Sequence, residues 1–306
     1  MSSASEPMGG GVAKLPLRET IKLSYSSYFN NFGDVLRISW LWLALVVPLM
    51  GAASWLQLSW MAGAMANLKR SGPLPPDAPP MPPLPVVTML LGGAAPIAVL
   101  LATLSIAVAW HRRMILDERP GVSGSNLMSG NVWRYAGAAL AAGLLALLPI
   151  GVIALPMFLV MGFVSPGVAQ APMPPQVPVL AAALFIGYIA AIAIGLRLIL
   201  LLPARAAGDM ALTFRQAWER TRGNTWRLLW GTVATTVPLG IVGVAVIAAV
   251  LGFPNADLMK LDGPAFKSYA ERMAVANVVV AAFFLLILPI GIGFLSHAYR
   301  HFFPQA

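Results

Sequence analysis

Long apolar segments alternate with short polar ones along almost the whole chain. About 20 apolar residues in a helix cross the hydrocarbon core of a bilayer, and six of the segments exceed that length. The pattern therefore predicts an all-α, polytopic membrane bundle with six transmembrane helices. We expect the spans at residues 38–66, 86–110, 135–164, 179–203, 228–252 and 273–296.

The stretch before the first span, residues 14–32, has an amphipathic period instead. Its apolar positions recur every three or four residues and share one helical face, formed by Leu17, Ile21, Tyr25, Tyr28 and Phe32. The charged positions can lie on the opposite, wet face, which holds Lys14, Arg18, Glu19 and Lys22. This pattern predicts an interfacial helix in the headgroup layer. The alternative is a solvated helix that packs on the bundle.

A five-residue motif, Gly-(Asp/Asn)-x-(Leu/Trp)-Arg, stands before three of the apolar segments. The copies are Gly33–Arg37, Gly130–Arg134 and Gly223–Arg227, and their glycines are 97 and 93 residues apart. We call it the glycine–arginine motif. Its spacing predicts three helical hairpins, roughly 14–110, 121–203 and 209–301, within one membrane domain, residues 14–306. Residues 1–13, rich in glycine, serine and alanine, are expected to be a disordered tail.

Each part of the motif has a role at a membrane boundary. The glycine lets the chain break between a surface segment and a spanning helix. The residue after it, Asp34, Asn131 or Asn224, can cap the first backbone amides of the new helix. The arginine can reach lipid phosphates while its aliphatic stem stays among acyl chains.

Composition and charge agree with a membrane location. Of 306 residues, 58% are hydrophobic and 10% are charged, against about 25% charged in soluble domains. The net charge of +9 is uneven, because 15 basic residues lie on the side of the termini and 5 in the opposite loops. The positive-inside rule then predicts that both termini lie in the cytoplasm. We expect the membrane to be a bacterial inner membrane. Membrane asymmetry accounts for the charge, so no nucleic-acid partner is expected.

The sequence offers little for catalysis. There are no cysteines, and none of the eleven acidic residues falls within a predicted span, where coupled transporters usually carry ionisable groups. His111, His297 and His301 can lie at one depth, but without an acidic residue close in sequence we expect no metal site. Walker A, His-Glu-x-x-His and Gly-x-Ser-x-Gly motifs are absent. We therefore expect neither a cofactor nor enzymatic activity.

Arg197 is a charged residue within a predicted span. Its side chain can extend to the headgroups, pair with an acidic residue such as Asp117, Glu118 or Asp209, or bind a lipid phosphate. Only the last of these makes it a ligand site.

The region around Arg197 resembles a known group of sequences. The matching residues are Arg197, Leu202-Pro203-Ala204, Ala206, Ala217-Trp218, Thr221 and Gly223-Asn224. They resemble bacterial six-span YciC-like proteins and the membrane domain that precedes glycerophosphoryl diester phosphodiesterases. In those fusions catalysis belongs to a separate soluble domain, so the resemblance implies an integral membrane protein and not that activity.

The leading hypothesis is a non-catalytic membrane protein that organises anionic lipid, or a membrane-protein partner or second copy, at its cytoplasmic face. The residues predicted to make these contacts are Arg37, Arg134, Arg197, Trp226 and Arg227. An alternative is a transporter or channel for an apolar or anionic solute, with Arg197 lining its path. A lipid-modifying enzyme would need a convergent nucleophile or metal set that the sequence does not show.

Overall fold

The computed structural model describes residues 13–71, 83–121, 125–163, 176–251 and 263–304. Within these ranges every regular element is a helix and there is no strand. The predicted all-α class is therefore confirmed. The predicted disordered tail lies outside the described residues, except for Ala13.

The described residues form a series of helices. In order they are α1 Leu17–Asn30, α2 Phe32–Ser71, α3 Val86–Leu116, the 3-10 turn η1 Ser125–Met128, α4 Gly130–Phe163, α5 Gln176–Leu198, α6 Leu201–Ala207, α7 Phe214–Arg220, α8 Thr225–Leu251 and α9 Gly263–Phe302.

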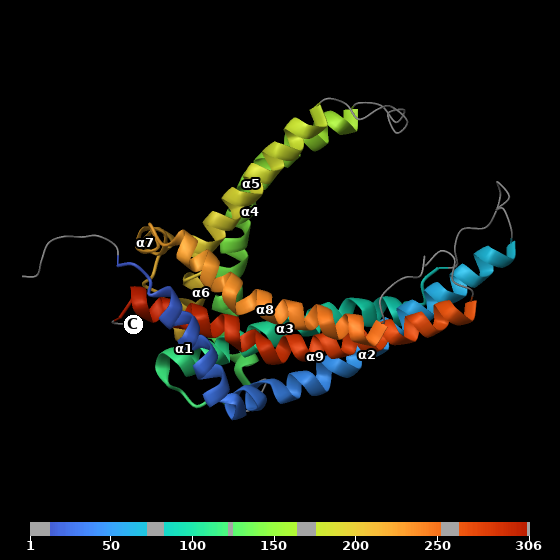
Figure 1. Ribbon diagram of the computed structural model, residues 1–306, viewed down its shortest axis with the longest axis horizontal. Coiled ribbons are helices and arrows are strands. Elements are labelled where there is room, and N and C mark those ends of the chain that lie inside the picture. The colour runs from blue at the N-terminus through green and yellow to red at the C-terminus, as the bar shows by residue number, and fades with distance from the viewer. Residues whose placement is uncertain (1–12, 72–82, 122–124, 164–175, 252–262, 305–306) are drawn as a thin grey trace, which may run out of the picture.

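Four long helices, α2, α3, α8 and α9, lie side by side, and α9 contacts the other three as well as α1 (Figure 1). The α4–α5 hairpin points away from this bundle (Figure 1). It joins the rest near one end, through contacts with α3, α6, α7 and α8. The three hairpins are thus not packed alike, and the threefold repeat stays a prediction.

Small residues let the bundle helices approach closely, as is usual between membrane helices. The inward face of α3 buries Ala98, Ala102 and Ser105. Between α8 and α9, Gly231 lies against Phe294 so tightly that an added Cβ would overlap the aromatic ring. Between α2 and α9, a Cβ on Gly51 would stand 3.0 Å from Val278 Cγ2.

Six described helices are long and apolar enough to cross a membrane. Their apolar side chains also cover outward faces: Leu140, Leu144 and Leu148 of α4 and Ile241 of α8 are all more than half exposed. A water-soluble monomer rarely leaves such large contiguous apolar surface uncovered. The chain is therefore a multi-pass, all-α membrane protein. The six candidate spans are Phe32–Ala64, Val86–Leu116, Gly130–Ala154, Ala181–Ala207, Thr225–Leu251 and Ala265–Phe302.

The fourth predicted span is interrupted. α5 ends at Leu198 and α6 begins at Leu201. The break follows from Pro203, which has no amide hydrogen to donate to the Ile199 carbonyl and whose ring would clash with that carbonyl in a continuous helix. The Leu202 amide donates to this carbonyl instead, at 3.1 Å. The predicted span at 179–203 is thus present, within the candidate span Ala181–Ala207, but it consists of two helices, and Arg197 lies in the last turn of α5.

Candidate functional site

Both ends of the described chain lie at one end of the bundle, together with α1, α6 and α7 (Figure 1). All three glycine–arginine motifs also lie there, because they occupy the beginnings of α2, α4 and α8. We call this end the basic rim and define it as residues 13–37, 111–121, 125–134, 197–230 and 297–304. It holds every residue that the sequence marked for lipid or partner contact.

The third motif holds the first described residues of the chain. The Leu15 amide donates to Asn224 Oδ1 at 2.9 Å, and Asn224 Nδ2 donates to the Ala13 carbonyl at 3.1 Å. Arg227 Nη1 donates to the Leu15 carbonyl at 2.6 Å. Leu15 itself is fully buried among α5, α6, α8 and α9. Arg227 therefore has an internal partner, whereas Trp226 is 70% exposed.

The first motif links α2 to the end of α3. Arg113 Nε donates to Asp34 Oδ2 at 2.8 Å, and the same guanidinium reaches Asn31 Oδ1 and the carboxylate of Asp117. Arg37, one turn after Asp34, is exposed, and no polar partner for it appears among the described residues.

The second motif has the weakest internal contacts. Arg134 is exposed, and its one hydrogen bond among the described residues runs from Nη1 to Asn131 Oδ1 at 3.4 Å. The three arginines of the motif thus differ: Arg227 is used internally, while Arg37 and Arg134 present their charge to the surroundings.

Asp34 and Asn131 already lie inside the first turns of α2 and α4, so the prediction that they precede and cap these helices is wrong. Asn224 directly precedes α8, and its Oδ1 accepts from the Leu15 amide, so its capping role stays a prediction. The prediction of a glycine break holds at Gly223, whose φ of +78° separates α7 from α8. At the first motif the break falls at Asn31, between α1 and α2, and Gly33 is already helical.

Arg197 packs against α7. Its Cζ stands 3.7 Å from the centre of the Trp218 ring, and Nη2 donates to the Trp218 carbonyl at 2.8 Å. Thr221 Oγ1 donates to the Ala217 carbonyl at 2.8 Å and lies 3.4 Å from that of Arg197. No carboxylate lies within ion-pair distance of Arg197 in the part of the chain described. Of the residues that carry the family resemblance, Arg197, Ala217, Trp218 and Thr221 therefore contact one another where α5 meets α7.

Several rim arginines bind carbonyl groups in the last turns of helices. Arg112 Nη1 donates to the Ala206 carbonyl of α6 at 3.1 Å, and Arg300 Nη1 donates to the Met114 carbonyl of α3 at 3.3 Å. Arg197 likewise donates to the Trp218 carbonyl in the last turn of α7. These carbonyls carry the negative end of the helix dipole and lie beyond the last backbone amides that could pair with them, so a guanidinium stabilises them. The Trp218 carbonyl also lies 3.2 Å from Thr221 Oγ1.

Acidic residues compensate only part of this charge. Ion pairs among the described residues join Arg112 to Glu118, Arg113 to Asp34 and Asp117, and Arg215 to Glu219. Asp209 accepts from the Tyr299 hydroxyl at 2.9 Å and from the amides of Ala211 and Leu212. Because a carbonyl does not cancel a full positive charge, the rim keeps a cationic excess.

Two of the three histidines make separate contacts with serines. His111 Nδ1 lies 2.8 Å from Ser296 Oγ, and His297 Nε2 lies 2.9 Å from Ser27 Oγ. No group of three His, Cys, Asp or Glu side chains suited to a metal occurs among the residues described.

α1 packs on α8 and α9 rather than standing apart from them. Its buried face is formed by Thr20, Ser24 and Tyr28, and Ser24 Oγ donates to the Ile290 carbonyl. Tyr25 donates to the Ala234 carbonyl at 2.9 Å, and burial raises the pKa of Tyr25, which keeps this hydroxyl a donor. Phe29 is 66% exposed. The packed alternative fits these contacts, and the interfacial location stays a prediction.

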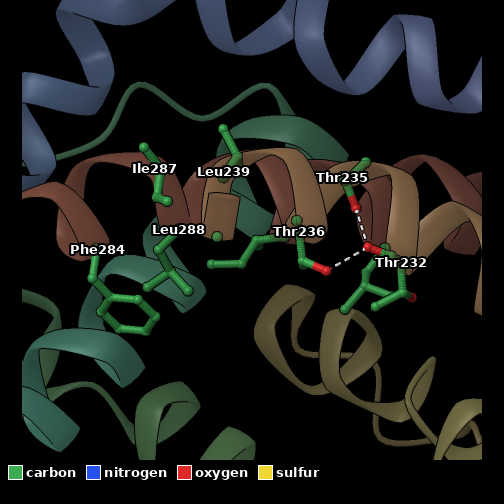
Figure 2. Close-up of a pocket in the computed structure, with 11 residues that line it drawn as sticks. Thr232, Thr235, Thr236, Leu239, Phe284, Ile287 and Leu288 are labelled. Carbon is green, nitrogen blue, oxygen red and sulfur yellow. Dashed lines mark hydrogen bonds between the residues drawn. The ribbon is translucent and has the colours of Figure 1, made fainter. Parts of the chain in front are cut away.

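A groove of about 410 Å³ lies between α8 and α9 (Figure 2). Phe284 and Leu288 line it from α9, and Thr232, Thr235 and Thr236 from α8. The hydroxyls of Thr235 and Thr236 donate hydrogen bonds to the Thr232 carbonyl, at 3.1 and 2.7 Å (Figure 2). The groove is therefore largely apolar, and Arg197 does not line it.

Comparisons of this chain with family models, with curated proteins and with solved structures find no match.

Proposed function

We propose that this multi-pass membrane protein is non-catalytic and organises anionic lipid, or a partner of acidic surface, at a cytoplasmic basic rim in a bacterial inner membrane. The observation that carries the proposal is the cationic excess of the rim. Arg112, Arg113 and Arg215 form ion pairs with nearby carboxylates. The other rim arginines bind carbonyl oxygens or have no carboxylate within ion-pair distance among the described residues.

Apolar side chains exposed beside these charges support lipid over a water-soluble partner. On α8, Trp226 and Trp230 are 70% and 57% exposed, and on α1 the exposed Phe29 lies one to two turns from Lys22. Tryptophan and basic residues together are typical of the membrane interface. Each basic residue near an anionic surface contributes about 1 kcal/mol to binding.

The family resemblance supports the same proposal. The resemblance implies an integral membrane protein without the phosphodiesterase activity, and the resembling residues all lie at the rim, where Arg197 stacks on Trp218. Their contacts are internal, so we assign them to the architecture of the rim. Lipid contact is assigned to Arg37, Arg134 and Trp226.

The test is the composition of the lipid that stays with the protein. The protein is extracted with its surrounding lipid in polymer nanodiscs, and phospholipid classes are quantified against the whole membrane. We expect enrichment of anionic over zwitterionic lipid, and a loss of much of that enrichment in the Lys22→Gln/Arg37→Gln variant. The matched control, Lys267→Gln/Arg272→Gln, removes the same two charge types at the far end of α9. Retained lipid that matches the membrane average would contradict the proposal.

The α8–α9 groove favours a second candidate, a channel or transporter for an apolar solute. Its volume of about 410 Å³ falls within the roughly 300–1,000 Å³ of small-molecule sites. In that case Gly240→Phe, which fills the groove, would abolish uptake of an apolar solute into vesicles containing the protein. Solute fluxes that are equal with and without the protein would remove this candidate.

A further inference from the structure

A second groove, of about 230 Å³, lies at the rim between α4, α6 and the segment that leads into α7. Arg134 and Arg205 line it together with Gly137 and Ala141 of α4. Arg134, Gly137, Ala138 and Ala141 follow one another at helical spacing along α4, so one continuous face runs from the cation at the rim into the apolar part of the helix.

The groove is cationic. Neither arginine has a carboxylate within ion-pair distance in the described part of the chain, and no acidic residue lines the groove. Arg205 is held in place by the carbonyls of Asp209 and Leu212, the latter at 2.8 Å from Nη2. The neighbouring Asp209 carboxylate is turned to Tyr299 and to the amides of Ala211 and Leu212. The groove thus suits an anion with several acceptor oxygens.

The remaining lining is apolar, which favours an amphiphile over a free anion. Leu201, Met210 and Phe214 complete the groove, and Met210 is 55% exposed beside the arginines. A Cβ added at Gly137 would meet no atom within 4 Å, so the space over this residue is open. Small side chains here leave room for a chain that lies against α4.

We infer that this groove binds one phospholipid, with its phosphate at Arg134 and Arg205 and an acyl chain over Gly137 and Ala141. The inference deepens the proposed function by naming one lipid site at the rim, and it rests on that function. Arg205 provides a fixed cation, and Arg134 closes on the phosphate from α4. Anionic phospholipid binds better than zwitterionic lipid because no acidic group in the groove balances the two cations.

The test is native mass spectrometry of the full-length protein in detergent, titrated with phosphatidylglycerol, phosphatidylcholine or inorganic phosphate. We expect one tightly bound phosphatidylglycerol, with weaker binding of phosphatidylcholine. Arg134→Gln should weaken it about tenfold, equivalent to about 1.4 kcal/mol. Gly137→Leu, which fills the open space, should weaken it at least as much. Gly143→Leu is the matched control, since Gly143 is exposed on α4 outside the groove and also has open space.

The outcomes separate this inference from the proposed function. If Gly137→Leu keeps the bound lipid while anionic lipid stays enriched around the protein, the lipid lies elsewhere on the rim and the groove assignment is wrong. If inorganic phosphate at millimolar concentration displaces the lipid, the apolar lining contributes nothing and the phospholipid assignment is overturned. Equal binding of phosphatidylglycerol and phosphatidylcholine by the wild-type protein would contradict both the proposed function and the assignment of a phospholipid to this groove.

Discussion

Leu15 and Asn224, 209 residues apart in the chain, are joined by a buried hydrogen bond of 2.9 Å. Asn224 is 1% exposed and uses both ends of its amide, accepting from the Leu15 amide and donating to the Ala13 carbonyl. This geometry pins the segment before α1 to the beginning of α8. The bond therefore couples the first described residues to the third hairpin and fixes where α1 crosses the rim.

Replacing Asn224 by alanine should destabilise the protein by about 1–3 kcal/mol, because the buried Leu15 amide loses its acceptor. The change should also expose the segment before α1 to proteases. The matched variant is Asn131→Ala, at the same motif position but with a single contact of 3.4 Å, and it should change stability little. Thermal unfolding in detergent and limited proteolysis measure both effects. Equal stability of the two variants would show that the segment is not held by Asn224.

Gly231→Ala should disrupt the α8–α9 pair, because the added Cβ would overlap the Phe294 ring. Overpacking of this kind typically costs about 1–3 kcal/mol. Gly240→Ala, on the same helix, adds a Cβ with no atom within 4 Å and should be neutral or slightly stabilising. The fraction of folded protein in size-exclusion chromatography and the unfolding temperature report the difference. A Gly231→Ala protein as stable as the wild type would contradict the observed packing.

Arg113→Gln should destabilise the junction of α2 and α3, because this guanidinium forms ion pairs with Asp34 and Asp117 and donates a hydrogen bond to Asn31. A partly buried carboxylate left without its cation costs more than the ion pair contributes. Arg37→Gln removes the same charge from an exposed position and should leave stability unchanged. Thermal unfolding of the two variants distinguishes a structural arginine from a surface one, and an equal drop in both would contradict this division.

Arg197 and Trp218 should show an energetic coupling of about 0.5–1 kcal/mol, the usual value for an exposed cation–π pair. The measurement is a double-mutant cycle with Arg197→Ala and Trp218→Ala. The hydrogen bond to the Trp218 carbonyl persists when the ring is removed, so the cycle isolates the stacking. Strictly additive effects would show that the ring does not stabilise the guanidinium.

The sequence predicted the elements that depend on local pattern. Six apolar helices and the break at Gly223 both follow from residues close in the chain. Pro203 was also visible in the sequence, and its ring and missing amide give the signal that the fourth span breaks near Ile199.

The partners of the rim side chains could not be predicted in the same way. Asn224 binds a segment more than 200 residues away, and Arg197 faces Trp218 only because α5 stops and the chain turns back through α6. Arg205, which no sequence pattern singles out, lines a groove with Arg134 because of the same turn through α6. Hairpin packing is likewise non-local, so a repeated motif did not reveal that the α4–α5 hairpin points away from the bundle of α2, α3, α8 and α9 (Figure 1).

The account depends on six crossings that place the basic rim on the cytoplasmic side. Because the chain has no cysteine, single substitutions can be labelled without a background. Ser26→Cys and Met128→Cys lie at the rim and Ser268→Cys at the far end of α9, all at exposed positions. A membrane-impermeant maleimide added to intact spheroplasts should label Ser268→Cys alone, and the other two only after permeabilisation. Labelling of either rim position in intact cells, or protection of Ser268→Cys, would contradict the account.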